Sequence, residues 1–323
     1  MNLLHQDPKD SPPLIALVGP TASGKSDAGF LLALELESRG VACEIVSADS
    51  MQVYRHMNIG TAKPGDAMRR RIAHHMLDIV EPTENFNVSR FQQEASKIIR
   101  GLLAGGRGAI VVGGTGLYVK ALVDGLNEAP AGDLQVRSRL EAEAEVLGGV
   151  TLYERLQEID PEAAEKIHPH NIRRVVRALE VYEMSGTPFS QFHRQQKRPA
   201  WAERFQWFGL SIPLDRLDRR IEERTRAMFQ RGLIDEVQGL LRRGCGSRHT
   251  ALQGLGYKEV VEGLAAGKSE VEMEQLVAQR TRRYARRQLT WWRPEKRIQW
   301  LDVEADAERP ARAVQRIMDA QDL

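Results

Sequence analysis

The octapeptide GPTASGKS, residues 19–26, constrains the fold of this chain more than any other feature. It follows the apolar run LIALV, residues 14–18, and it leads into a helical pattern. A buried strand, a glycine-rich turn and a Lys-Ser pair that opens a helix together predict a P-loop, whose backbone N–H groups face a phosphate. In such a loop Lys25 reaches the terminal phosphate, and the Ser26 hydroxyl suits a magnesium ion. The open question is which phosphate compound the loop holds.

The first 125 residues alternate between strand and helix patterns. The strand patterns are almost entirely apolar, as expected for strands of a parallel sheet that is covered on both faces. We expect strands at 14–18, 43–47 and 108–114, and helices at about 25–39, 89–103 and 117–126.

The pattern changes from about residue 126 to residue 198. This stretch shows helical periodicity and turn signals but no strand pattern, and strand patterns return at 205–212 and 298–303. The simplest interpretation is an α/β fold: a P-loop NTPase-like parallel-sheet core, residues 1–125 and 199–323, with an inserted all-helical domain, residues 126–198.

Composition excludes several classes of protein. No apolar run approaches the roughly 20 residues that span a bilayer, and the N-terminus lacks the pattern of an export signal. The two cysteines, Cys43 and Cys245, are far apart, which excludes a disulfide framework and a cysteine zinc site. We therefore expect a cytoplasmic protein with no membrane segment, and we expect it to be a monomer.

The net charge of +2 hides an uneven distribution of charge. Residues 280–297 contain seven arginines and one lysine against one glutamate, and a second basic cluster contains Arg173, Arg174 and Arg177. Asymmetry of this kind predicts a polyanionic partner.

Asp49 is the acidic residue closest to the end of a predicted strand. It follows 43–47, whereas the strand at 108–114 ends in glycines rather than in the carboxylate that a P-loop ATPase uses to hold magnesium. One interpretation is a turn or helix-cap residue. The other is a general base or metal partner, because the carboxyl ends of parallel strands converge on the ligand.

Further polar residues lie in loops that we expect near the same ligand. Thr61 and Lys63 in NIGTAKP, and Thr115 in GGTGLY, offer additional donors. The adjacent pair His74 and His75 is expected to be structural, because neighbouring residues do not share a helix face and no acidic residue recurs at ligand spacing.

Two arginines, Arg220 and Arg224, lie one helical turn apart and therefore share a helix face. Most charges of that helix are expected to be solvated. A diphosphate leaving group would nevertheless need an arginine, because forked guanidinium donors match phosphate oxygens.

The segment QRTRRYARRQLTWWR most resembles a nucleic-acid contact. Arg280, Arg283 and Arg287 recur at helical spacing with Tyr284, Trp291 and Trp292 between and after them. Arginines can pair with phosphates while aromatic rings stack on bases. The alternative is an amphipathic helix with core tryptophans, and we expect the tryptophans in the core and the arginines at the contact.

Seven motifs occur in order: GPTASGKS, ADSMQVYR, IGTAKP, HHMLDI, GGTGLY, GYKE and TRRYARRQLTWWR. With them the chain closely resembles the bacterial tRNA dimethylallyltransferases, also called tRNA isopentenyltransferases, from about Leu14 to Trp300. Ser26 stands where many members have threonine, so the hydroxyl is kept. The resemblance implies transfer of a dimethylallyl group from dimethylallyl diphosphate to the exocyclic amine of the adenosine 3′ of the anticodon.

The resemblance also implies roles for individual residues. Asp49 would be the base, with Lys25, Arg224 and Thr21 as the other catalytic residues and Mg²⁺ on Ser26 as the cofactor. The diphosphate-binding residues would be Gly19, Pro20, Thr21, Ala22, Ser23, Gly24, Lys25, Ser26, Arg220 and Arg224. Positions that contact tRNA would be Asp49, Ser50, Met51, Gln52, Thr115, Arg137, Arg173, Arg174, Val175, Val176, Arg177, Gln253, Gly254, Leu255, Gly256, Tyr257 and Lys258; we add Arg280, Arg283 and Arg287 from the helical stripe.

Three other interpretations compete with this one. A P-loop nucleoside or nucleotide kinase would share the loop and the sheet, with ATP as donor. An adenylate isopentenyltransferase acting on free AMP would explain the loop but not the arginine-rich helix or the insertion. A non-catalytic RNA-binding protein would have a vestigial loop, but nothing in GPTASGKS or ADSMQ is degenerate.

Overall fold

The chain forms two compact units in the computed structural model, which describes residues 11–126, 129–130, 132–194, 198–246, 248–302 and 309–320. Unit 1 consists of residues 1–123 and 201–323, and unit 2 of residues 124–200. The insertion therefore begins and ends within two residues of the boundaries that the sequence pattern suggests.

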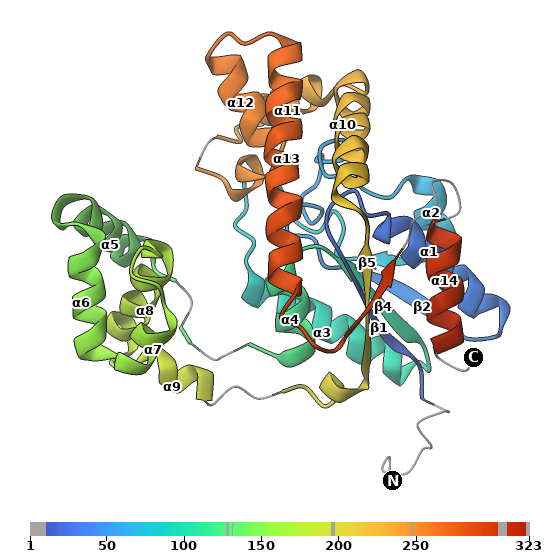
Figure 1. Ribbon diagram of the computed structural model, residues 1–323, viewed down its shortest axis with the longest axis horizontal. Helices are drawn as coiled ribbons and strands as arrows, with labels where there is room; N and C mark the ends of the chain where they lie inside the picture. The colour runs from blue at the N-terminus through green and yellow to red at the C-terminus, as the bar shows by residue number, and fades with distance from the viewer. Residues whose placement is uncertain are drawn as a thin grey trace. The chain divides into compact units, whose positions relative to one another are not determined.

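Unit 1 is built on a six-stranded sheet with the order β3-β2-β4-β1-β5-β6 (Figure 1). All neighbouring strands are parallel. This confirms the predicted α/β class with a parallel sheet. The strands are β1 (Leu14–Val18), β2 (Cys43–Ser47), β3 (His74–His75), β4 (Gly108–Gly113), β5 (Phe205–Ser211) and β6 (Ile298–Asp302).

Strand β1 lies in the middle of the sheet, and its register places the P-loop. Val18 is paired with Gly113 of β4 on one side and with Gly209 of β5 on the other. The chain that leaves β1 therefore emerges at the carboxyl edge between two neighbouring strands, where ligands bind in open α/β sheets.

Helices cover both faces of the sheet. On one face, Ile15 and Leu17 of β1 pack with Leu32 of α1 (Lys25–Ser38) and Ile317 of α14 (Arg309–Ala320). On the other face, the alternate residues of β1 pack in the cluster that contains α3 (Val88–Ala104) and α4 (Gly116–Asp124). Burial on both faces explains the continuous apolar runs in the sequence.

The remaining helices of unit 1 are α2 (Asp66–Arg71), α10 (Leu214–Gln230), α11 (Leu233–Arg242), α12 (Tyr257–Ala265) and α13 (Glu270–Trp292), with short 3₁₀ turns at Ala202–Arg204 and Thr250–Gln253. Helix α13 begins at a capping box, in which Ser269 and Glu272 satisfy each other's backbone N–H groups. It packs against α10 and α12, and Figure 1 shows these helices grouped beyond one end of the sheet.

Unit 2 has its own small core. Its helices are α5 (Leu134–Leu147), α6 (Gly149–Ile159), α7 (Pro161–Lys166), α8 (Ile172–Ser185) and α9 (Phe189–Arg194), and its described residues contain no strand. Leu140, Leu152 and Leu179 are among the side chains that fill the core. Glu180 is also fully buried, where its carboxylate accepts hydrogen bonds from Arg137, Arg177 and the Asp133 N–H.

Among the described residues, no helix combines the length and the apolar character needed to cross a bilayer.

Candidate active site

A cavity of about 320 Å³ opens at the carboxyl ends of β1, β2 and β4. Its lining contains the P-loop, two arginines and two aspartates as well as apolar side chains. The P-loop and charged residues are Thr21, Ala22, Gly24, Lys25, Ser26, Asp27, Asp49, Arg220 and Arg224, and the apolar ones include Ile45, Ala62, Pro64 and Val112. Both an anion and a small apolar group find matching surroundings in it.

The P-loop has the backbone of an anion cradle. Gly24 caps α1 with φ 89°, and no side chain caps the first N–H groups of the helix. These N–H groups remain available to an anion, and the helix dipole favours negative charge there. Ala22 has φ 62°, an unusual conformation for a residue with a side chain. Ser23 Oγ is buried without a hydrogen-bond partner among the described residues, as expected where a polar ligand is accommodated.

Lys25 and Arg224 bring two positive charges to this cradle. Lys25 Nζ donates to Pro20 O at 3.1 Å. Burial and the nearby Arg224 lower the pKa of Lys25 to about 8, although Asp49 acts in the opposite direction. Burial also lowers the pKa of Arg224, and the carboxylates of Asp49 and Asp27 oppose that shift. Two desolvated cations close to each other favour a multiply charged anion between them.

Arg220 lies close to the P-loop. A Cβ atom on Gly24 would be 3.6 Å from Arg220 Nη2, in van der Waals contact. Arg220 and Arg224 are both on α10 and both line the cavity, so the structure brings together the two arginines that helical spacing placed on one face.

Asp49 fits both interpretations that the sequence left open. Its Oδ1 accepts hydrogen bonds from the N–H groups of Met51 at 2.8 Å and Gln52 at 3.3 Å, so it is a turn-capping residue. It also lines the cavity, where its charge acts on Lys25 and Arg224. The turn bonds use Oδ1 and fix the direction of the carboxylate. Thr115 supports the same turn, because its Oγ1 accepts from the Ser50 N–H at 3.2 Å.

Gln52 is held by hydrogen bonds at both ends of its amide. Ser47 Oγ donates to Gln52 Oε1 at 2.9 Å, and Gln52 Nε2 donates to Thr61 O at 3.1 Å. Gln52 and Thr61 line the cavity.

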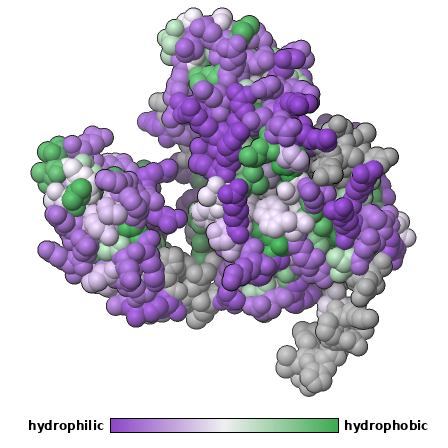
Figure 2. Space-filling view, viewed as in Figure 1, coloured by the Kyte–Doolittle hydropathy of each residue, from purple (hydrophilic) through white to green (hydrophobic). Residues whose placement is uncertain are grey.

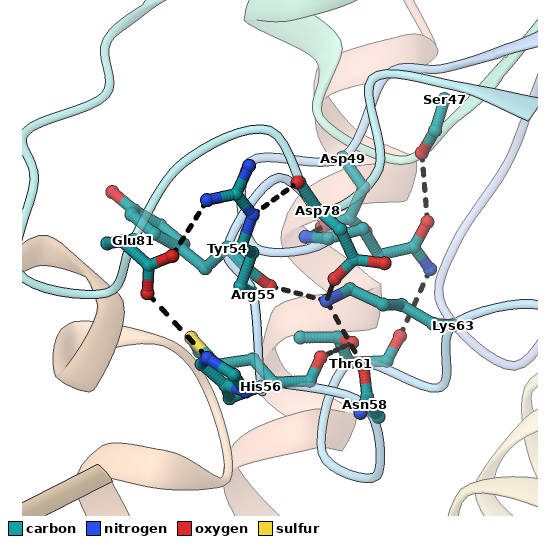
Figure 3. A network of polar contacts seen from close by, with 12 residues as sticks. Ser47, Asp49, Tyr54, Arg55, His56, Asn58, Thr61, Lys63, Asp78 and Glu81 are labelled. Carbon is teal, nitrogen blue, oxygen red and sulfur yellow. Dashed lines mark hydrogen bonds and ion pairs between the residues drawn. The ribbon is translucent and has the colours of Figure 1, made fainter. Parts of the chain in front are cut away.

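Lys63 was expected to add a donor beside the ligand, and the structure places it elsewhere. Its side chain is buried and its Nζ donates to Asp78 Oδ1 at 2.6 Å and to Tyr54 O, as Figure 3 shows. Asp78 also pairs with Arg69. A lysine that leaves water needs a carboxylate partner, and Asp78 in the loop before α3 supplies one.

Tyr284 and Gln288 of α13 also line the cavity. The sequence motifs did not assign either residue to the site. The two residues lie one helical turn apart. Burial and the charge of Asp49 raise the pKa of Tyr284 to about 12, against hydrogen bonds to Thr115 and Gln288. Gln288 accepts from the Thr21 N–H at 2.7 Å and donates to Gly114 O at 2.9 Å. The sequence indicates this pair only through their i, i+4 spacing and the polar group at the end of each side chain.

The arginines of α13 divide into two sets. Arg282 and Arg286 form ion pairs with Glu222 and Asp218 of α10. The stripe Arg280, Arg283 and Arg287 is exposed, and no carboxylate partner is found for it within the described chain. In Figure 2 the surface over α13 is largely hydrophilic.

The aromatic residues near the stripe also differ from each other. Trp292 is fully buried and meets Trp207 edge to face, as expected for a core tryptophan. Trp291 is 40% exposed, with its ring over Gly116, where any Cβ would lie 2.0 Å from Nε1. The expectation of two core tryptophans therefore holds for Trp292 alone.

The GYKE segment contributes structure rather than an exposed surface. Tyr257, which the resemblance placed at the tRNA, is 0% exposed, and its hydroxyl donates to Glu236 Oε1 at 2.6 Å. The same carboxylate accepts from the N–H groups of Asn58, Ile59 and Gly60. Glu236 was missed by sequence reasoning because the backbone N–H groups that it binds lie 176–178 residues away. Of the segment 253–258, Gln253 and Lys258 are exposed, Leu255 is half-buried, and Gly254 and Gly256 are buried.

The basic cluster of unit 2 needs a similar correction. Val175 and Val176, expected to contact tRNA, are 0% and 1% exposed because they face the core of the unit. Arg173 and Arg174 are exposed, whereas Arg137 and Arg177 pair with the buried Glu180. Only the arginine side chains of this cluster can meet a ligand from solvent.

No group of three or more His, Cys, Asp or Glu side chains converges as a metal site in the described part of the chain. His74 forms a hydrogen bond between its Nδ1 and Ile72 O and stacks on Phe30, and His75 contacts Glu44. The histidine pair is thus engaged in packing and hydrogen bonds at the short strand β3.

The fold and the cavity define a class of protein: a parallel α/β protein with a P-loop at the end of β1 and a carboxylate in the same cavity. The chain belongs to the IPP transferase family, whose model matches residues 52–295.

Similar proteins cover nearly the whole chain. It is 45% identical to the tRNA dimethylallyltransferase of Desulforudis audaxviator, over 91% of this chain and 93% of the relative. It is also 45% identical to that of Pelotomaculum thermopropionicum, over 94% and 96%. Among solved structures, the tRNA isopentenylpyrophosphate transferase of Bacillus halodurans is 36% identical with a TM-score of 0.68 and covers 96% of both chains. A eukaryotic dimethylallyltransferase acting on tRNA is 27% identical with a TM-score of 0.77, over 95% of this chain and 78% of the other.

Proposed function

We propose that this protein is a tRNA dimethylallyltransferase, which transfers the dimethylallyl group of dimethylallyl diphosphate to the exocyclic amine of the adenosine 3′ of the anticodon and releases diphosphate. The observation that carries the proposal is that the P-loop cations and the Asp49 carboxylate line one cavity. An anion site for the donor and a base for the acceptor would thus lie in the same cavity, as transfer from a diphosphate to an amine requires.

The P-loop, Lys25 and Arg224 would hold the diphosphate, and Arg220 supports the loop. When the allylic carbon–oxygen bond breaks, negative charge grows on the leaving oxygens. Preorganised N–H groups and cations stabilise that charge without rearranging. Burial and Arg224 lower the pKa of Lys25, and a diphosphate bound beside it would raise that pKa by favouring the charged ammonium.

The donors present fit Mg²⁺. The Ser26 hydroxyl is exposed at the start of α1, and Asp27 and Asp49 line the same cavity. Mg²⁺ commonly takes few protein ligands and is held mostly by substrate phosphates and water. Bound there, the ion would neutralise charge on the diphosphate.

Asp49 would act on the acceptor. An adenine amine is a poor nucleophile because its lone pair is delocalised into the ring. A carboxylate that accepts a hydrogen bond from the amine, and takes its proton as the new bond forms, assists by roughly 10²–10⁴-fold. Tyr284 stays protonated at neutral pH and can donate a hydrogen bond beside Asp49.

The RNA would be bound by exposed arginines. Arg280, Arg283 and Arg287 of α13 and Arg173 and Arg174 of unit 2 carry charge that can pair with phosphates. The target base has to leave its stack to reach the cavity, which costs a few kcal/mol and least in a single-stranded loop. This supports an anticodon stem-loop as substrate.

We also propose that the protein works as a monomer in the cytoplasm. One chain supplies all the cavity residues described above, and both cysteines are free and buried, which suits a reducing compartment.

The direct test is mass spectrometry of nucleosides from unmodified tRNA incubated with the protein, Mg²⁺ and dimethylallyl diphosphate. A dimethylallyl adduct on the adenosine 3′ of the anticodon is the expected product. A matched thermal-denaturation series separates the kinase alternative: dimethylallyl diphosphate should protect the protein more than ATP does at equal concentration. Equal protection by ATP without an RNA adduct would favour the kinase.

A further inference from the structure

Gln288 joins three segments of unit 1 that are far apart in the sequence. Through Thr21 it reaches the P-loop, through Gly114 the turn after β4, and it belongs itself to α13. The side chain is 6% exposed. Because one end of its amide accepts a hydrogen bond and the other end donates one, the orientation of the amide is determined.

The space around this amide admits little change. A Cβ atom on Gly114 would lie 2.3 Å from Gln288 Nε2, so glycine is needed there. On the other side, Thr21 directly precedes Ala22 with its φ of 62°. Backbone of this kind persists only where neighbouring groups hold it. The bond from the Thr21 N–H to Gln288 is such a restraint, so the shape of the cradle depends on a side chain of α13.

The same turn of α13 carries one residue of the exposed stripe. Arg287 precedes Gln288, and its guanidinium carbon lies 5.6 Å from the centroid of the Tyr284 ring, which lines the cavity. A polyanion bound to Arg287 therefore restrains the same turn of α13 from which Gln288 binds the Thr21 N–H.

We propose that Gln288 is a positioning residue that couples RNA binding on α13 to diphosphate binding in the P-loop. The proposal rests on the function proposed above, in which both ligands are bound at once. Bound RNA fixes the turn at Arg287, the amide of Gln288 fixes Thr21, and the cradle then binds diphosphate more tightly. By linkage, diphosphate tightens RNA binding by the same factor.

The test measures the Kd of inorganic diphosphate, with Mg²⁺, in the absence and presence of a saturating anticodon stem-loop RNA. For the wild-type protein we expect RNA to lower this Kd by about fivefold or more. Gln288→Met keeps the length of the side chain but loses both hydrogen bonds. In this variant diphosphate alone should bind about tenfold more weakly, and the effect of RNA should disappear.

Gln275→Met is the matched control, because Gln275 is an exposed glutamine on the same helix. It should keep both the wild-type Kd and the RNA effect. For Gln288→Met the KM for dimethylallyl diphosphate at saturating tRNA should rise, while the Kd of tRNA measured without any diphosphate changes little, a split that a general loss of folded protein would not produce.

Gly114→Ala displaces the amide from the opposite side and gives a second test if Gln288→Met does not fold. Its effect should match that of Gln288→Met, and the double variant should be less impaired than the sum of the two. The proposal is wrong if RNA leaves the wild-type Kd unchanged, or if the displaced or missing amide leaves the RNA effect intact. Neither result depends on prenyl transfer, whose absence in the wild type would instead contradict the proposed function.

Discussion

Lys25 Nζ donates its hydrogen bond to the carbonyl of Pro20, five residues earlier in the same loop. The ammonium thus contacts the backbone of its own P-loop. Burial and the nearby Arg224 lower the pKa of this lysine from 10.5 to about 8, against the opposing charge of Asp49.

The first prediction is that diphosphate binding takes up a proton at alkaline pH. A bound anion raises the pKa of Lys25 above its value of about 8 in the free protein. Between these two values the free lysine is neutral and the bound one charged, so affinity should fall as the pH rises above 8. Below about pH 7 the lysine is charged in both states, and this group contributes no uptake. Calorimetry at pH 9 in two buffers of different ionisation enthalpy measures the protons taken up.

Lys25→Arg is the control for this measurement, because arginine stays charged throughout the range. Its diphosphate binding should show no linked proton at pH 9. Identical proton uptake by both proteins would assign the effect to another group.

The second prediction concerns Asp49→Asn. Asparagine retains an oxygen that can accept from the N–H groups of Met51 and Gln52, so the turn should persist. The loss of basicity should lower the rate of single-turnover prenyl transfer roughly 10²–10⁴-fold, while tRNA affinity stays within a few fold. A variant with near wild-type turnover would show that Asp49 serves the turn alone.

The third prediction separates the two sets of arginines on α13. Each phosphate contact on a single strand contributes about 0.7 to the slope of log affinity against log salt concentration. Replacing Arg280, Arg283 and Arg287 together by glutamine should reduce that slope by up to about 2. Thermal protection by dimethylallyl diphosphate should be unchanged.

The matched control replaces Arg282 and Arg286, which are already paired with Glu222 and Asp218. Its salt slope should change much less. Superimposable slopes for the triple variant and the wild type would mean that the stripe is only a solvated helix face.

The fourth prediction tests the structural role of Tyr257. Tyr257→Phe removes the hydroxyl that donates to Glu236 at 2.6 Å, which should lower the free energy of unfolding by about 1–3 kcal/mol. Tyr182→Phe, a partly exposed tyrosine of α8, is the control and should change it little. Denaturant titration measures both, and tRNA affinity should stay near the wild-type value. Unchanged stability with a large loss of tRNA binding would place Tyr257 at the RNA instead.

The sheet was predictable because buried parallel strands leave a strong apolar signal, and the P-loop because its turn needs particular residues. Strand β3 left no such signal: it is two histidines long and pairs with only one neighbour. The hydrogen bonds between distant segments could not be predicted from the sequence for another reason. Gln288 and Glu236 act through partners 267 and about 178 residues away, and no local pattern reports a hydrogen bond over that distance.

Motif resemblance located segments better than it located side chains. In the segment 173–177 the helical period alternates exposed arginines with core valines, so neighbours in one motif have different environments. The same holds for 253–258, where the buried Tyr257 directly precedes the exposed Lys258. Periodicity, applied within each motif, would have separated contact residues from core residues.

The indole N–H of Trp201 donates to Leu122 O at 3.2 Å, so the chain entering unit 2 and the chain leaving it are joined by a hydrogen bond inside unit 1. This junction is buried: Trp201 is 7% exposed, and the guanidinium group of Arg100 lies over its ring. In terms of chain connectivity, the 77 residues of unit 2 are an insertion whose two ends are neighbours in unit 1. An insertion of that kind tolerates substitutions, insertions and deletions during evolution without disturbing the strands of the sheet. The choice of RNA substrate can therefore diverge while the catalytic chemistry stays constant.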